Sequence, residues 1–305
     1  MQIPLPDFFE LQAPTHWRSI DLISDLHLHA QDEATFAAWE NYLKTTPADA
    51  VLMLGDVFEV WVGDDAALVA DSFEAHCAAV LRAACTHKAV YFMHGNRDFL
   101  VGEAFLRSCG VQFLADPCVL TFGEQRSLLT HGDALCLDDV DYMVFRAMVR
   151  APAWQSAFLA QPLAERQSIA RGLRTQSEAR KATGASYADV DAPAALAWLN
   201  AAQAQRMIHG HTHRPADHAM GPKQTQKPNS GEQATLRHVL CDWDLQAKPA
   251  RAQVLRLGMP AQPTWPAATH SKHGTTQPNA APNVQLAQQS VHHNQTMLIE
   301  RIALC

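Results

Sequence analysis

The segment "MIHGHTHRPADH", residues 207–218, is the most informative part of the sequence. Its histidines His209, His211 and His213 occupy every second position. In an extended segment every second side chain points to the same side, so this run directs its imidazole groups together. A polar ring at alternate positions is a poor way to fill an apolar core. The run therefore predicts a loop that serves a binding site, and its partners are expected to follow other strands.

The first half of the chain alternates between strand-like and helix-like patterns. Helical spacing appears in two segments, 33–44 and 72–84, and the run 119–130 predicts a hairpin. Short apolar runs predict strands at 19–24, 50–54 and 89–93, and later at 205–210, 235–243 and 252–257. Strands alternating with helices predict an α/β sheet, in which reactive loops lie beyond the strand ends.

Four more short segments place metal-capable side chains directly after an apolar run. They are "SDLHLH" (24–29), "LGDVFEVWVGDD" (54–65), "HGNRDF" (94–99) and "THGD" (130–133). Together with the opening stretch they predict one ligand set, which comprises Asp25, His27, Asp56, Asn96, His131, His211 and His213. Each segment alone has an ordinary alternative, since D-x-H can begin a helix and G-N-R-D can form a turn. Their order and common position at strand ends favour a shared site.

The donor types in this set point to particular metals. They are carboxylate and amide oxygens and imidazole nitrogens, with no thiolate, which suits Mn²⁺, Fe²⁺ or Zn²⁺. Seven ligands are too many for one tetrahedral zinc ion. They suit two ions that share a carboxylate, an arrangement that clamps the attacking and leaving oxygens in phosphoryl displacement.

The order D-x-H, G-D, G-N-R-D, H-G-D and G-H-T-H resembles the calcineurin-like metallophosphoesterases over roughly residues 19–245. The resemblance implies an α/β fold, a β-sandwich flanked by helices, here with a helical cap insertion. It also implies two divalent metal ions, with Asp56 bridging them. The first ion would take Asp25, His27, Asp56 and His213, and the second Asp56, Asn96, His131 and His211. His209 shares the alternation but is assigned to neither ion, and it is expected to be packed.

Longer strings resemble one branch of this superfamily, the UDP-2,3-diacylglucosamine pyrophosphatases of lipid A biosynthesis. They are "GDVFEVWVGDD", "HGNRDFLVG", "HGDALCLDDVDYMVFR" and "IHGHTHRP". The resemblance implies hydrolysis of the pyrophosphate bond of UDP-2,3-diacylglucosamine by a dimetal-activated water. The products are UMP and 2,3-diacylglucosamine 1-phosphate. It favours Mn²⁺, a monomer, and a cytoplasmic protein that associates peripherally with the cytoplasmic face of the inner membrane.

The same resemblance implies a set of catalytic and substrate-binding residues. Arg97 and Asp56 would be catalytic, and Arg97 could grip a phosphate with its planar fork, although an ion pair with Asp98 is the ordinary alternative. Substrate contacts would come from Asn96, Arg97, Asp139, Ser177, Lys181 and His211. The family pattern has an asparagine where this chain has Lys181, and this departure leaves the roles of the cap residues open.

Four regions are expected from the pattern of the whole chain. They are an N-terminal extension (1–17), a metallophosphoesterase core (18–137 and 205–258), a helical lipid-binding cap (138–204) and a polar, proline-rich, disordered tail (259–305). The composition of residues 245–305 predicts that they are dispensable for the chemistry. The last apolar run, "MLIERIALC", could be a short helix or a docking segment.

The cap sequence contains apolar residues at helical spacing. They are Val140, Val144, Phe145, Met148, Val149, Trp154, Phe158 and Leu159. Most are expected to pack the cap onto the core, and some to line an acyl-chain groove, with Met148, Phe145 and Trp154 as the first candidates.

Composition excludes several other classes of protein. The formal net charge of -7 argues against nucleic-acid binding driven by positive charge. No run is apolar enough for a membrane span or a signal peptide. The seven scattered cysteines are typical of reduced thiols in a cytoplasmic protein. Two alternatives stay open: another dimetal phosphoesterase acting on nucleotides or phosphoproteins, and a non-catalytic scaffold of the same fold.

Overall fold

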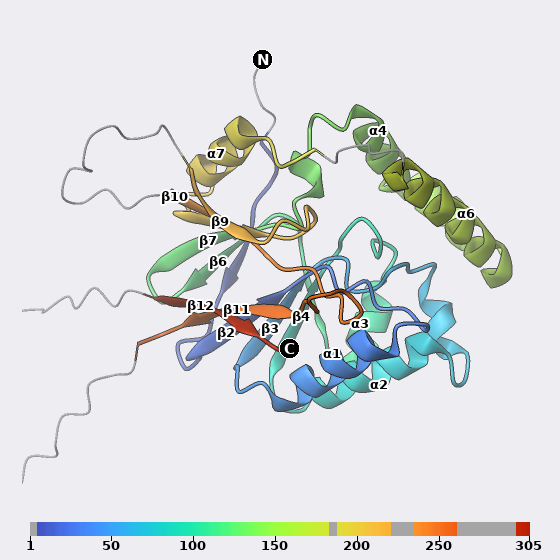
Figure 1. Ribbon diagram of the computed structural model, residues 1–305, viewed down its shortest axis with the longest axis horizontal. Coiled ribbons are helices and arrows are strands. Elements are labelled where there is room, and N and C mark those ends of the chain that lie inside the picture. Colours follow the sequence, from blue (N-terminus) through green and yellow to red (C-terminus); the bar gives the residue numbers. More distant parts are fainter. Residues whose placement is uncertain (1–4, 183–187, 221–234, 261–296) are drawn as a thin grey trace, which may run out of the picture.

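Two six-stranded sheets face each other in the computed structural model (Figure 1). The structure describes residues 5–182, 188–220, 235–260 and 297–305, with only the backbone described for residues 174–182. Sheet A has the strand order β1 (Phe9–Gln12), β6 (Cys118–Phe122), β7 (Gln125–Leu129), β8 (Arg206–His209), β10 (Thr235–Val239), β9 (Ala216–Met220). Sheet B has the order β12 (Leu298–Ala303), β11 (Gln253–Gly258), β2 (Ser19–Ile23), β3 (Ala50–Leu54), β4 (Ala89–Met93), β5 (Gln112–Leu114).

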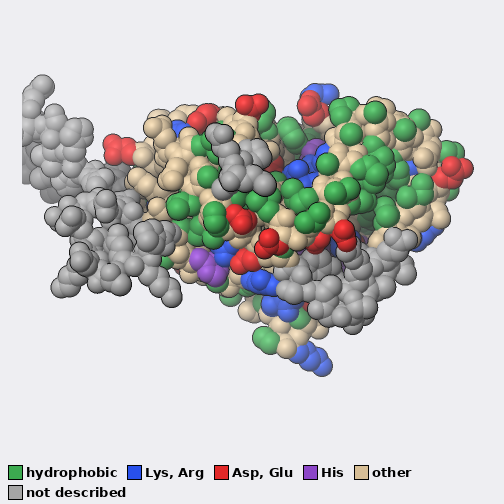
Figure 2. Space-filling view, turned by 90° about the horizontal axis from the view of Figure 1, so that it is seen from above, with side chains coloured by type: hydrophobic (Ala, Val, Ile, Leu, Met, Phe, Trp, Pro, Cys, Tyr) green, Lys and Arg blue, Asp and Glu red, His purple; other side chains and the backbone are tan. Residues whose placement is uncertain are grey.

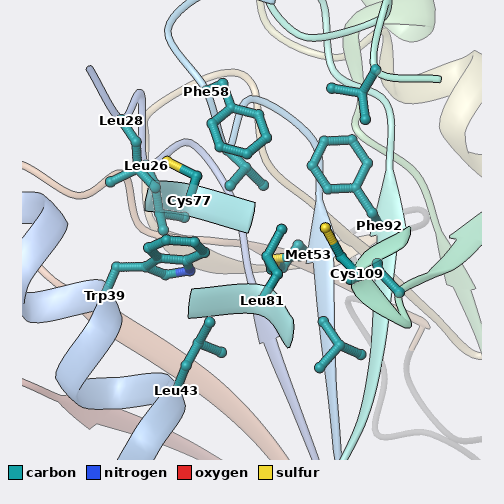
Figure 3. Packing of buried hydrophobic residues seen from close by; sticks show 14 of the residues in the cluster. Leu26, Leu28, Trp39, Leu43, Met53, Phe58, Cys77, Leu81, Phe92 and Cys109 are labelled. Carbon is teal, nitrogen blue, oxygen red and sulfur yellow. The ribbon is translucent and has the colours of Figure 1, made fainter. Parts of the chain in front are cut away.

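Helices cover both outer faces, so the core has four layers. The outer face of sheet B is covered by α1 (Glu33–Thr45), α2 (Phe73–Cys85) and α3 (Glu103–Cys109), and that of sheet A by α7 (Ala192–Ala201). Strand alternation produces the layers: on β3, Val51 and Met53 pack toward the helices, while Leu52 and Leu54 face the other sheet. Figure 3 shows Trp39 and Leu81 packed with Met53 under the helices.

The predicted elements of the first half are confirmed, and so is the expected sandwich. Strands β2, β3 and β4 pair in parallel, and β8 pairs in parallel with β7 and β10. Because parallel strands place their carboxyl ends at one edge of a sheet, the loops after β2, β3 and β4 meet at one edge of sheet B, and those after β7 and β8 meet at one edge of sheet A. The predicted hairpin is also present, with β6 antiparallel to β7.

The predicted cap contains two helices that project from the core, a short one that packs against the core through Phe158, and one that belongs to the core. Helices α4 (Val140–Val149) and α6 (Leu163–Ala182) project from one side of the sandwich in Figure 1, with α5 (Pro152–Leu159) between them in the chain. Helix α7, also within 138–204, packs its Ala194, Ala195 and Leu199 on sheet A. Two short 3-10 helices, at Asp64–Leu68 and Asp133–Leu135, follow the second and fourth motifs.

Both ends of the chain differ from the expectation. Strand β1 lies within the predicted N-terminal extension and pairs with β6. The prediction of a tail without structure is wrong for the last residues, because β12 pairs antiparallel with β11 and Met297 is buried between the sheets. Met297 and Ile299 pack between the sheets and Ile302 packs on the other face of sheet B, so apolar residues on both faces hold this run as a strand. The part of the predicted tail from 261 to 296 lies outside the described residues.

Candidate metal centre

Five of the seven predicted ligands have left-handed backbone conformations. Their φ angles lie between 49° and 65°, and the residues are Asp25, His27, Asp56, His211 and His213. A non-glycine residue in this region costs roughly 1–2 kcal/mol, because its Cβ approaches the following carbonyl oxygen. Such strain gathers at functional sites, where the surrounding structure maintains it. Here it turns side chains from sharply bent loops toward one point.

Asp25, His27 and His213 form the first group. The Nε2 atoms of His27 and His213 lie 3.2 Å apart, and the Nε2 atom of His213 lies 3.5 Å from Oδ1 of Asp25. One donor atom from each residue falls within 4.8 Å of the others, a spacing that suits a shared cation. The loops after β2 and β8, far apart in the sequence, supply these side chains.

Asn96, His131 and His211 form the second group. Oδ1 of Asn96 lies 3.0 Å from Nε2 of His131 and 2.8 Å from Nδ1 of His211. Asp56 lies between the two groups: its Oδ1 is 3.7 Å from Nε2 of His131, and its Oδ2 is 4.0 Å from Nε2 of His27. A carboxylate in this position can serve both groups at once.

Two glycines explain why the motifs read G-N and G-H. A Cβ atom on Gly95 would lie 2.1 Å from Oδ1 of Asp56, and one on Gly210 would lie 2.2 Å from Oδ2 of Asp25. The neighbouring backbone orients both carboxylates, because the amide of Arg97 donates to Asp56 at 2.8 Å and that of His211 donates to Asp25 at 3.0 Å. The missing side chains therefore let the loops close around the two acidic groups.

Asp98 binds the backbone of the loops that carry Asp56 and Asn96, a role that the motif alone did not reveal. It is fully buried and accepts backbone N–H groups of Gly95 at 2.8 Å and Val57 at 2.8 Å. Burial, helped by the nearby carboxylate of Asp56, raises the pKa of Asp98 to about 7. The alternative of an ion pair between Arg97 and Asp98 is not what the structure shows, since Nη1 of Arg97 lies 3.7 Å from Glu59.

Hydrogen bonds behind the histidines fix which ring nitrogen faces the site. Nδ1 of His131 lies 2.9 Å from the carbonyl oxygen of Leu54, and Nδ1 of His27 lies 2.9 Å from Glu59. Each Nδ1 can therefore carry a proton, which leaves Nε2 free to bind a cation. Glu59 was not among the predicted site residues, although it stands in the second motif, three residues after Asp56.

The two histidines of the second group differ in how strongly they hold protons when no ion is bound. Burial lowers the pKa of His131, but the carboxylates of Asp56 and Asp133 outweigh it and raise that pKa to about 9. Burial and the neighbouring His131 lower the pKa of His211 to about 4. Carboxylates and imidazoles that are crowded together in this way, with their lone pairs convergent, fit divalent metal ions.

The other residues singled out in the sequence lie outside the two donor groups or outside the described side chains. Asp139 caps α4 by accepting the backbone N–H of Tyr142 at 3.1 Å. His209 is fully buried, as expected for a packed residue. Ser177 and Lys181 belong to α6, and their side chains lie outside the described part of the structure.

Helix α4 is fastened to the metal-site loops by polar contacts. Asp133, fully buried, accepts hydrogen bonds from the hydroxyl of Tyr142 and from Nε of Arg146, the latter at 2.7 Å. Arg150 donates from Nη2 to the carbonyl oxygen of Gly95 at 2.8 Å. The cap therefore contacts the same loop that carries Asn96.

The apolar residues of the cap divide into packed and exposed groups. Trp154 stacks on Phe158 with ring centroids 5.0 Å apart and lies beside Phe99 of the core, so this groove candidate takes part in the packing expected for most of the cap residues. Val140, Val144 and Met148 form an exposed stripe, with 65%, 67% and 50% exposure. Figure 2 shows hydrophobic side chains gathered on the half of the molecule where the cap lies.

Comparisons with known proteins agree with this geometry. A model of the calcineurin-like phosphoesterase family matches residues 18–215. The UDP-2,3-diacylglucosamine hydrolase of Chromohalobacter salexigens is 40% identical over 245 residues, covering 79% of this chain and 94% of that protein. Those of Aromatoleum aromaticum and Ralstonia nicotianae are 45% and 43% identical, covering 64% and 77% of this chain and 80% and 87% of their own length.

Similarity to solved structures is weaker. Vacuolar protein sorting 29 from Cryptosporidium parvum aligns with 79% of this chain and 84% of its own at 14% identity and a TM-score of 0.39, too low to carry an argument. The family assignment rests on the sequence relatives and on the matched family model. The chain belongs to the calcineurin-like phosphoesterase family and, within it, to the UDP-2,3-diacylglucosamine hydrolases.

Proposed function

We propose that this protein hydrolyses the pyrophosphate bond of UDP-2,3-diacylglucosamine in lipid A biosynthesis, releasing UMP and 2,3-diacylglucosamine 1-phosphate. The observation that carries the proposal is the position of Asp56 between two groups of nitrogen and oxygen donors. Relatives of this name match nearly their whole length here, so both the core and the cap have counterparts in them.

Two divalent metal ions, Mn²⁺ in our proposal, are the cofactors. One would be held by Asp25, His27, Asp56 and His213, and the other by Asp56, Asn96, His131 and His211. When bound, the ions lower the pKa of a water molecule and withdraw charge from the phosphoryl oxygens. The protein contributes the fixed placement of its ligands, which the glycines and hydrogen bonds above maintain.

Arg97 is the proposed phosphate-binding residue of the chain. Its backbone N–H holds Asp56, and its guanidinium is half-buried beside Glu59, within the same loop as Asn96. A guanidinium so placed stabilises charge on phosphoryl oxygens without a change of position. Asn96 and His211 would lie near the phosphates, and Asp139 and Ser177 would contact the glucosamine part. Lys181 would bind substrate at the position where the family has an asparagine.

The cap is the proposed site of acyl-chain and membrane contact. Its exposed stripe of Val140, Val144 and Met148 offers apolar surface next to the metal-site loops. Such a surface suits a cytoplasmic monomer that associates peripherally with the cytoplasmic face of the inner membrane. None of the helices in the described part of the chain has the length and apolar character that a membrane span requires.

Mass spectrometry of the products in ¹⁸O-labelled water tests the proposed reaction. Metal-stripped protein supplied with Mn²⁺ should convert UDP-2,3-diacylglucosamine to UMP and 2,3-diacylglucosamine 1-phosphate, with ¹⁸O in the UMP. Label in the lipid product would mean attack at the other phosphorus. Release of phosphate from nucleotides or phosphopeptides, with the lipid substrate left intact, would support the alternative phosphoesterase instead.

A further inference from the structure

The last strand, β12, carries an arginine at a position that faces the interior of the sandwich. Pairing with β11 places Ile299 opposite Leu257 and Arg301 opposite Leu255, and both partners face sheet A. Met297 and Ile299 pack in this apolar layer. Arg301 interrupts the row, although an aliphatic residue there would bury more apolar surface. Its polar contacts must therefore explain its presence.

Arg301 reaches from the edge strand β12 of sheet B to the edge strand β9 of sheet A. Its Nη2 donates to the carbonyl oxygens of Ala216 and Val239, each at 3.1 Å, and to the carboxylate of Asp217. Its Nη1 donates to Gln253 on its own sheet at 3.4 Å. Asp217 in turn accepts Nδ1 of His238 at 2.8 Å. The arginine is thus the centre of a polar contact between the two sheets.

The two carbonyl groups belong to the last register pair of β9 with β10. Ala216 pairs with Val239 there, and the chain leads to the candidate metal centre from both residues, through the segment before Ala216 and the segment after Val239. His213 precedes Ala216 by three residues, and Asp242 follows Val239 by three residues. Nδ1 of His213 lies 3.7 Å from Asp242, so the two short segments meet again at the metal site.

We propose that Arg301 is a positioning residue for the metal site. It ties the register pair Ala216–Val239 to β12 and thereby fixes the two segments that place His213 and its neighbour Asp242. His213 has a strained left-handed backbone, with φ of 52°, and contacts outside the residue must maintain that conformation. The nine C-terminal residues therefore contribute to metal binding although they contain no metal ligand.

Binding of Mn²⁺ to metal-stripped protein, measured by calorimetry, tests the inference. Arg301→Met should weaken Mn²⁺ binding about 10- to 100-fold, the usual effect of losing a group that orients a ligand. Arg301→Lys should be intermediate, since an ammonium group cannot reach all the acceptors of a guanidinium fork. Glu300→Gln is the matched control, because Glu300 is exposed on the opposite face of β12, and it should bind Mn²⁺ as the unchanged protein does.

A purely structural role for Arg301 has a different signature. It would lower the thermal midpoint equally with and without Mn²⁺ and leave the affinity unchanged, and that result would overturn the inference. If Arg301 positions His213, the loss of midpoint should be larger with Mn²⁺ present, because weaker binding stabilises the folded state less.

A second experiment keeps the inference testable if Arg301→Met does not fold. Asp217→Asn removes the charged acceptor of Arg301 and should also weaken Mn²⁺ binding, though by less than Arg301→Met. Unchanged affinity in a folded Asp217→Asn protein, together with unchanged affinity in Arg301→Lys, would contradict the inference.

The inference rests on the proposed metal site, and the two can fail separately. If the unchanged protein binds no Mn²⁺, the proposed function fails. If the unchanged protein binds Mn²⁺ and the folded Arg301 variants bind it equally well, only the positioning role fails.

Discussion

At the residue scale, the proposed ligands differ in how much each contributes to metal affinity. Asp56 lies between both donor groups, whereas His27 belongs to one of them. A bridging carboxylate contributes to the affinity for two ions, and an imidazole at one side contributes to the affinity for one. This difference leads to a direct comparison of two variants.

Asp56→Ala should lose activity in a way that excess Mn²⁺ does not rescue, while His27→Ala should recover part of its activity at high Mn²⁺. The physical reason is that the first change removes a ligand from both ions and the second removes one bond from one ion. Titration of activity against Mn²⁺ concentration checks this. Equal rescue of the two variants would argue against a bridging role for Asp56.

Gly95→Ala should disrupt the centre although it changes no ligand. The added Cβ would meet Oδ1 of Asp56 at 2.1 Å, which forces the carboxylate or its loop to move. We expect at least tenfold weaker Mn²⁺ binding, measured by calorimetry. Gly172→Ala is the control: no atom lies within 4 Å of its added Cβ, and in the exposed part of α6 it should stabilise by about 0.5–1 kcal/mol. A Gly95→Ala protein with normal Mn²⁺ affinity would contradict the proposed close approach.

Mn²⁺ affinity should rise with pH through the neutral range. The raised pKa of His131, about 9, lies above its usual 6.5, so in the metal-free protein this histidine stays protonated at neutral pH and its proton competes with the ion. Its protonation stabilises the metal-free fold below about pH 6.5, and that contribution is lost as pH rises toward 9.

One displaced proton predicts about tenfold tighter binding per pH unit between about pH 6.5 and pH 8.5. Dissociation constants for Mn²⁺ across that range measure it, and His131→Gln should lose most of the slope. A flat affinity in the unchanged protein would show that His131 is already neutral or does not bind the ion.

At the element scale, α4 has two faces with separate tasks. Tyr142, Arg146 and Arg150 face the metal-site loops and bond to Asp133 and Gly95. Val140, Val144 and Met148 lie on another face and stay exposed. Polar docking on one side leaves the apolar stripe free to contact a lipid. The residues that pack the cap, such as Trp154, are therefore poor probes of lipid recognition.

Val144→Ser and Met148→Ser should each raise KM for the diacylated substrate about tenfold and leave hydrolysis of a small phosphodiester unchanged. Each methylene removed from water contributes about 0.8 kcal/mol, so loss of contact with roughly two methylenes accounts for the change. Steady-state kinetics on both substrates check this. The control is Phe113→Ser, at an exposed apolar residue in β5 of the core. If both activities fall together in folded variants, the cap supports the centre and does not recognise the lipid.

At the scale of the whole molecule, the C-terminal strand β12 forms one edge of sheet B. Gly258 and Leu298 are register partners although 39 residues separate them in the sequence. Met259 and Pro260 also contact Arg18, so the strand end is fixed on both sides. Composition alone predicts that a chain shortened to about residue 258 keeps its chemistry. Such a chain would lack β12 and the contacts of Arg301.

Excision of residues 261–296, with a short glycine-rich turn in their place, should preserve the fold and the Mn²⁺ affinity. Closing a shorter loop costs less entropy, by about 0.6 kcal/mol per halving of its length, so the thermal midpoint should rise slightly. Removal of residues 297–305 is the contrasting variant and should weaken Mn²⁺ binding. Loss of folding on excision of 261–296 alone would mean that this segment contributes to the core.

The order of strands and helices in the first half, the family and the proposed ligand set can all be predicted from the amino-acid sequence. This is possible because strand periodicity is local and because metal chemistry restricts which residues serve as ligands. The glycines of G-N and G-H are readable for the same reason, since a close approach admits no side chain.

The roles of residues that contact distant segments of the chain become visible only in the folded molecule. Glu59 behind His27 is recognisable only when the loops after β2 and β3 are brought together. Trp154 reads as a groove residue from its spacing but packs on Phe99, because helical periodicity does not say which neighbour an apolar face meets. The strand β12 follows a long polar segment, and its pairing with β11, with Arg301 reaching sheet A, is a long-range contact that no local pattern encodes.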